Sequence, residues 1–264
     1  MKSLKLPAVY GALTVLTGIT AGSPKLVALS MGLSLFIPAL FVLTARESLA
    51  AAALATILSL GALALYSPRA PFDVLPFQAV GALLLKLLER PTLAVLGGAL
   101  VLFTGAVLEE LLVGLPEDVK SLPLFGSYRW GIYFFTALLF SEAVYGIALI
   151  FLRRGELFLR LKFGFLPVFL FLITGSLSLL AQGAVKVVAV NLLIATLGIF
   201  TAQGVAVLLY FIGRLSPLLR LLTLVLVLFF PMGFLAGALL LGFLDNWLDF
   251  RKLSGGGSDG SNSA

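Results

Sequence analysis

The sequence predicts an all-α membrane protein, a polytopic bundle of about eight to ten membrane-crossing helices. Of its 264 residues, 61% are apolar and only 11% are charged, and a chain with so little charge cannot cover a water-soluble surface. The apolar residues form long segments joined by short polar connections. The longest uncharged segment, residues 187–213, would be roughly 40 Å long as a helix, which is enough to span a bilayer even when the helix is tilted.

The apolar segments follow one another along the whole chain. The clear spans expected are residues 6–21, 26–44, 48–66, 92–108, 130–152, 164–180, 186–214 and 221–244. Residues 75–88 are ambiguous, because so short a segment carrying Lys86 is as typical of an interfacial or re-entrant segment as of a span. Pro231 should kink the last span, and Gly233 and Gly237 beyond it form a GxxxG face.

No polar segment is long enough for a soluble domain, so we expect one integral membrane domain over residues 1–252 and a disordered tail over residues 253–264. With residues 75–88 counted as a span and the basic N-terminus in the cytoplasm, the chain crosses nine times and its acidic loop lies outside. Arg251 then falls on the far side, unless the segment broken at Pro231 is a pair of short helices.

Several function classes are excluded by what the chain lacks. There is no cysteine and no histidine, which removes disulfides, thiolate nucleophiles and imidazole sites, and no GxxxxGK[ST], GxSxG or HExxH pattern occurs. We therefore expect no enzyme, no cofactor and no metal site. The net charge of +6 does not indicate nucleic-acid binding, because the cations stand at the ends of apolar segments, as topology signals do.

The densest group of cations follows the span that ends near residue 152. This basic segment carries Arg153, Arg154, Arg160 and Lys162. Four cations within so few residues are the strongest topology signal in the chain, and they predict a cytoplasmic segment in contact with anionic lipid.

Three polar residues inside spans are candidates for ligand binding. Glu142 is a carboxylate in the middle of a span, and lipid exposure of such a group is costly, so it should face a cavity or a partner. The alternatives are an interhelical hydrogen bond or a pair with Lys186. Asn191 and Gln203 lie in the longest span, and either ligand contacts or interhelical hydrogen bonds would explain them.

The C-terminal end holds candidates for partner docking. Asp245, Asp249 and Lys252 fall at i, i+4 and i+7, which is one stripe of a helix leaving the membrane, and Arg251 lies beside them. A docking surface for a membrane or cytoplasmic partner is one interpretation. A solvated, self-paired helix end is the other, and two carboxylates are far from a divalent-metal site.

Three segments carry a resemblance to a known family. FLRLKFGFLPVFLFLITG, NLLIATLGIFTAQGVAVLLYFIGR and GFLDNWLDFRK resemble the YybS family of predicted multi-pass bacterial membrane proteins, a family of unknown function. The matching positions are Asn191, the pair Gln203-Gly204, and the run from Gly242 through Asp245 to Asp249-Phe250-Arg251. The family is suspected to be distantly related to the substrate-binding membrane subunits of energy-coupling-factor transporters. The resemblance implies a helical bundle in a bacterial cytoplasmic membrane that holds a small molecule and docks on partners.

Two functions are compatible with these observations. The first is a ligand-binding or transport-related membrane subunit, acting with a partner that supplies the energy. The second is a non-transporting scaffold that organises an envelope complex through its GxxxG faces and its C-terminal end. A polar cavity around Glu142 would favour the first, and a packed core with a co-purifying partner would favour the second.

Overall fold

The computed structural model describes residues 5–23, 25–114 and 123–253. Over these residues the chain forms helices and no strand, so the all-α prediction is confirmed. The acidic pair Glu117 and Asp118 and the tail from residue 254 onward lie outside the described residues. Leu253, expected in the tail, is the last residue of a short helix.

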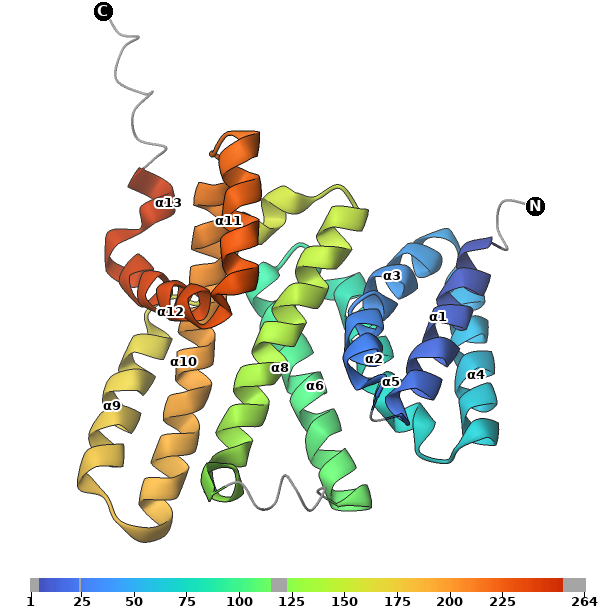
Figure 1. The fold of residues 1–264 in the computed structure, drawn as a ribbon, viewed down its shortest axis with the longest axis horizontal. Helices are drawn as coiled ribbons and strands as arrows, with labels where there is room; N and C mark the ends of the chain where they lie inside the picture. The colour runs from blue at the N-terminus through green and yellow to red at the C-terminus, as the bar shows by residue number, and fades with distance from the viewer. Residues whose placement is uncertain (1–4, 24, 115–122, 254–264) are drawn as a thin grey trace, which may run out of the picture. The chain divides into compact units, whose positions relative to one another are not determined.

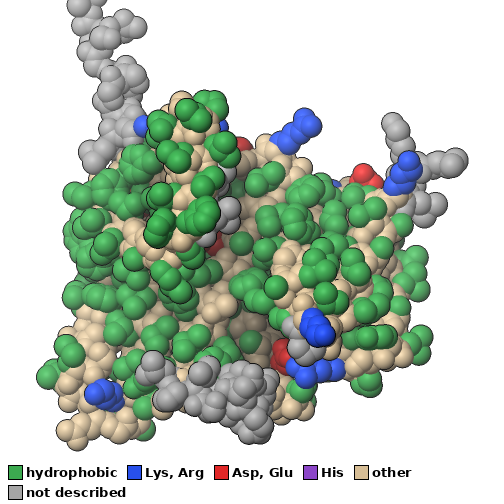
Figure 2. All heavy atoms as spheres, in the orientation of Figure 1, with side chains coloured by type: hydrophobic (Ala, Val, Ile, Leu, Met, Phe, Trp, Pro, Cys, Tyr) green, Lys and Arg blue, Asp and Glu red, His purple; other side chains and the backbone are tan. Residues whose placement is uncertain are grey.

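The polytopic prediction is confirmed by the length and composition of the helices. Within the described residues, seven helical segments are long and apolar enough to cross a membrane, namely Val27–Glu47, Leu49–Tyr66, Ala70–Leu87, Pro91–Val113, Phe125–Phe151, Gly183–Ile212 and Pro231–Leu248. The ambiguous segment, residues 75–88, lies in a helix of 18 residues, Ala70–Leu87, apart from Leu88, which caps it. The helix is long enough to span because it begins ahead of the apolar run. Figure 2 shows hydrophobic side chains over most of the visible surface, as lipid contact requires.

The chain divides into two compact units. Unit 1 comprises residues 1–120 and 140–158, and unit 2 comprises residues 121–139 and 159–264. Helix α8 (Pro123–Phe151) contributes its first half to unit 2 and its second half to unit 1. The single membrane domain over residues 1–252 stays a prediction.

Unit 1 contains the N-terminal helices, seen in blue to green in Figure 1. They are α1 (Lys5–Ala21), α2 (Val27–Ser34), α3 (Ile37–Glu47), α4 (Leu49–Tyr66), α5 (Ala70–Leu87) and α6 (Pro91–Val113). Helix α1 packs along α4, where Gly18 meets the side chain of Leu63. The core around them includes Tyr10, Ile37 and Val74, all fully buried.

Unit 2 is organised around its longest helix, α10 (Gly183–Ile212), which packs against α9 (Leu166–Leu180) and α12 (Pro231–Leu248). The remaining elements are α11 (Pro217–Phe229) and α13 (Phe250–Leu253). Gly204 of α10 and Gly242 of α12 lie so close to the opposite helix that a Cβ on either would overlap its backbone. Small residues at a crossing allow this approach.

The expected kink at Pro231 is a complete break. Helix α11 ends at Phe229, Phe230 has φ −130° and ψ 57°, and α12 starts at Pro231. A proline at the first position of a helix fits there because its missing N–H would have no partner anyway. The last apolar segment is therefore a pair of helices, the alternative that the sequence left open.

Candidate functional site

Asn191 joins α10 to α8 within unit 2. Its Oδ1 accepts a hydrogen bond from the backbone N–H of Gly131 at 2.7 Å, and its Nδ2 donates to the carbonyl of Ser127 at 3.0 Å and to that of Val187 at 2.8 Å. A Cβ on Gly131 would lie only 2.6 Å from the carbonyl oxygen of Asn191, so glycine allows this close crossing. The amide is fully used by hydrogen bonds to the backbone.

Gln203 is also occupied by the protein itself. Its side chain is 1% exposed; Oε1 accepts from the N–H of Phe163 at 3.1 Å and Nε2 donates to Oδ2 of Asp245 at 2.9 Å. Asn191 and Gln203 are thus brought into two separate interhelical contacts. This agrees with the interhelical alternative, and the structure does not bring the two amides together.

Asp245 is the centre of a buried polar network. Its side chain has no exposed surface, and it accepts from Gln203, from the N–H of Phe250 at 3.1 Å, and from Nη2 of Arg251 at 2.6 Å. Nη1 of Arg251 donates to the carbonyls of Leu159 and Leu161, at 2.9 and 2.6 Å. We call these three side chains, Gln203, Asp245 and Arg251, the C-terminal network.

The expected acidic stripe at the C-terminal end is wrong in its geometry. Helix α12 ends at Leu248, and Asp249 follows in the left-handed conformation with φ 42°. The i, i+4, i+7 relation therefore breaks at Asp249. Asp245 lies inside the protein, and Asp249 forms a salt bridge of 3.1 Å with Lys162 of the basic segment.

Glu142 lies in unit 1, in the second half of α8, and its side chain is only 3% exposed. Its Oε1 atom has no hydrogen-bond partner within the described part of the chain. Its neighbours on the helix are satisfied: Ser141 donates to the carbonyl of Val95 at 2.8 Å, and Tyr145 donates to that of Leu88 at 2.8 Å. The prediction that Glu142 avoids lipid agrees with this burial, and its carboxylate is left available.

Gln78 of α5 is a buried polar residue that the sequence analysis missed. It is 3% exposed, and neither its Nε2 nor its Oε1 atom has a hydrogen-bond partner among the described residues. An amide within an apolar segment could have indicated this residue, but the sequence did not establish whether that segment spans the membrane. In unit 1, Gln78 and Glu142 are therefore buried side chains with polar atoms that lack a hydrogen-bond partner among the described residues, whereas the three side chains of the C-terminal network are bonded to each other.

The basic segment is partly neutralised by acidic partners. Arg154 makes a two-pronged salt bridge to Glu89, at 2.6 and 3.1 Å, and the hydrogen bond and charge of that carboxylate raise the pKa of Arg154 above its ordinary value. Lys162 pairs with Asp249. Arg153 and Arg160 are exposed. The segment's predicted lipid contact therefore depends most on Arg153 and Arg160.

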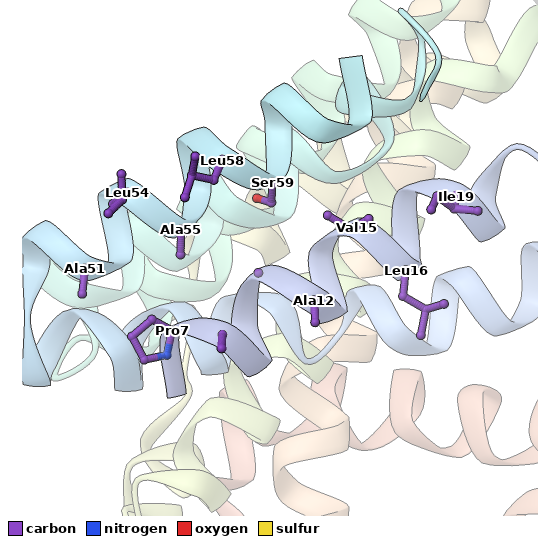
Figure 3. A pocket seen from close by; sticks show the side chains of 12 residues that line it. Pro7, Ala12, Val15, Leu16, Ile19, Ala51, Leu54, Ala55, Leu58 and Ser59 are labelled. Atoms are coloured by element: carbon purple, nitrogen blue, oxygen red, sulfur yellow. The ribbon is translucent and has the colours of Figure 1, made fainter. Parts of the chain in front are cut away.

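An apolar groove of about 660 Å³ lies between α1 and α4 (Figure 3). It is lined mainly by small and aliphatic residues, among them Gly11, Ala12, Ala51, Ala55 and Leu58. None of the residues predicted to bind a ligand lines it. No cluster of three or more acidic metal ligands occurs in the described ranges.

The fold and the exposed apolar helices define a multi-pass integral membrane protein. Comparison of the chain with protein-family models, with curated proteins and with solved structures finds no match.

Proposed function

We propose that this protein is a ligand-binding or transport-related membrane subunit whose ligand or coupling ion is held at Glu142. The observation that carries the proposal is a buried carboxylate with an unpartnered oxygen in the second half of a membrane-spanning helix. An ionised carboxylate left without a partner in such surroundings costs several kcal/mol. Glu142 is therefore protonated, or it holds a cation or a cationic group of a ligand.

The two amides predicted to bind a ligand have both of their polar groups bonded within the protein. Asn191 and Gln203 have their hydrogen bonds filled by the protein. Gln78 is a buried amide whose side-chain atoms have no hydrogen-bond partner among the described residues, and it belongs to unit 1, as Glu142 does. The proposed contact for the ligand or ion is therefore Glu142.

A partner would supply the energy, because the chain has no nucleotide-binding motif. The resemblance of its C-terminal segments to the YybS family supports the same proposal, and we propose a bacterial cytoplasmic membrane as the location. Fold analogy alone does not fix function, so the proposal rests on Glu142.

One structural feature, the surface of α12 around Gly237, supports the scaffold hypothesis. Gly237 has no atom within 4 Å of the position that a Cβ would take, so the GxxxG face at Gly233 and Gly237 is open for another helix. A scaffold would use that face and would not need Glu142.

A hydrophobic carbodiimide distinguishes the two functions, because it reacts with protonated carboxyl groups in apolar surroundings. We expect an adduct on the peptide that contains Glu142, and loss of this adduct in Glu142→Gln. The control is Glu156→Gln, which changes a carboxylate whose side chain is 57% exposed and which should leave the adduct unchanged.

The class of ligand can be identified by testing which ions prevent the carbodiimide from reacting with Glu142. Sodium, potassium and tetramethylammonium ions serve as probes, each added before the carbodiimide to the purified protein in lipid nanodiscs. Protection by one of them would support a cation or a cationic ligand at Glu142. An adduct that no probe ion and no change of buffer pH affects, together with an unaltered thermal stability in Glu142→Gln, would contradict the proposal and favour the scaffold.

A further inference from the structure

The start of α11 lies at the C-terminal end of α10. Only residues 213–216 separate the two helices. The guanidinium of Arg214 stacks on the ring of Tyr210 at 4.2 Å, and Arg220 donates to the carbonyls of Gly213 and Leu215. These contacts hold the first turn of α11 next to the last turn of α10.

The end of α12 returns to the same end of α10. The hydroxyl of Tyr210 donates to the carbonyl of Arg251 at 3.3 Å, and the rings of Phe211 and Phe250 lie 6.3 Å apart. Tyr210 thus contacts both Arg214, which precedes α11, and Arg251, which follows α12. All of these residues belong to unit 2, so the relation does not depend on how the two units are arranged.

Neither helix reaches the other end of α10. Helix α11 has 13 residues, which corresponds to roughly 20 Å, against about 30 Å for the hydrocarbon core. Helix α12 crosses α10 where Ala238 and Gly242 meet Phe200 and Gly204, in the C-terminal half of α10. In Figure 1, α12 runs obliquely from the lower end of α11 toward α13, while α9 and α10 are seen from the side, so α12 lies at an angle across α10.

We infer that α11 and α12 form a re-entrant segment, which enters the membrane and returns to the same side without crossing it. Although α12 is long and apolar enough to span, it lies across α10, and its end is fixed beside the basic segment by Arg251 and by the Lys162–Asp249 salt bridge. The nine crossings expected from the sequence become eight, and the C-terminal end lies on the side of Arg160 and Arg214.

The distribution of charge agrees with this topology. One side of unit 2 then carries Arg160, Lys162, Arg214, Arg220 and Arg251. Arg129 and Lys186 lie near the N-terminal ends of α8 and α10, the helices that Asn191 joins there. A crossing by α12 would instead separate Arg251 from the other cations, against the usual one-sided bias of basic residues.

Single cysteines test the inference, because the natural chain has none. The positions are Arg160→Cys, Ser216→Cys before α11, and Ser258→Cys in the tail, with Gln182→Cys in the turn between α9 and α10 as the opposite-side control. Each variant is treated with a membrane-impermeant maleimide in right-side-out and in inside-out vesicles.

We expect the cysteines at positions 160, 216 and 258 to react in the same vesicle preparation and the cysteine at 182 in the other. Reaction of positions 216 and 258 from opposite sides would overturn the re-entrant segment, because it would require α11 and α12 to cross. Reaction of position 258 in both preparations would overturn it as well. None of these outcomes depends on the function proposed for Glu142.

Discussion

Arg251 turns back onto Asp245: its Nη2 atom lies 2.6 Å from Oδ2 of an aspartate that has no exposed side-chain surface. The other arm of the guanidinium, Nη1, donates to the carbonyls of Leu159 and Leu161. Arg251 therefore holds α13 against the segment that precedes α9. The same residues were expected on a docking surface, and this geometry changes what their mutation should do.

Replacing Asp245 by Asn should strongly destabilise the protein. The change leaves Arg251, whose side chain is 10% exposed, without its anionic partner, and breaking a buried pair in this way costs about 3–5 kcal/mol. The measurement is thermal unfolding in detergent micelles. Asp249→Asn is the matched control, since its pair with Lys162 is partly exposed and should be worth about 0–1 kcal/mol. Equal effects of the two substitutions would argue against the buried pair.

Gly242→Ala should disrupt the crossing of α10 and α12. A methyl group there would overlap the carbonyl of Phe200, and backbone cannot move aside as a flexible side chain can. Gly237→Ala places the same methyl group into open space and should be neutral or slightly stabilising, because alanine favours the helix. Unfolding temperatures of the two variants check the contrast. A tolerated Gly242→Ala would mean that the helices are farther apart.

Asn191→Ala should lower stability without changing the chemistry at Glu142. The substitution removes three hydrogen bonds and leaves the N–H of Gly131 without its acceptor, at a cost of about 1–3 kcal/mol. Thermal unfolding measures the loss, and the carbodiimide assay should give the same adduct and the same protection as the natural chain. Loss of protection in Asn191→Ala would instead place Asn191 in the ligand site. Gln182→Ala, at an exposed amide, is the control for a general effect.

Arg160→Ala should reduce bound anionic lipid more than Arg154→Ala. Arg160 is exposed, whereas the charge of Arg154 is already compensated by Glu89. Native mass spectrometry of protein extracted with phosphatidylglycerol would count the retained lipids in each variant. If Arg154→Ala loses as many lipids as Arg160→Ala, the salt bridge to Glu89 does not shield that guanidinium from lipid.

The segment between α8 and α9 should face the cytoplasm, because its four cations are the strongest topology signal in the chain. Gly155→Cys suits this test, since Gly155 is exposed and a Cβ there meets no atom within 4 Å. The cysteine should react with an impermeant maleimide in inside-out vesicles only. Reaction in intact cells would reverse the orientation of the protein.

The sequence by itself determined the class of protein and nearly all of its helices. A helix satisfies its backbone hydrogen bonds within one segment, so an apolar segment of sufficient length must be helical in lipid wherever its neighbours lie. The same local argument identified Asn191, Gln203 and Glu142 as residues that cannot face lipid, and all three have partners or are buried.

Only the tertiary structure decided how these polar residues are used. Hydropathy cannot show that Asp245 faces inward toward Arg251, because the partner lies beyond the helix end and the backbone must first turn at Asp249. Nor can it show that α12 lies across α10, since its length and composition are those of a span and its direction is set by the backbone contact at Gly204 and Gly242. Pairings and helix directions depend on contacts between residues far apart in the chain, and a pattern along one segment does not contain them.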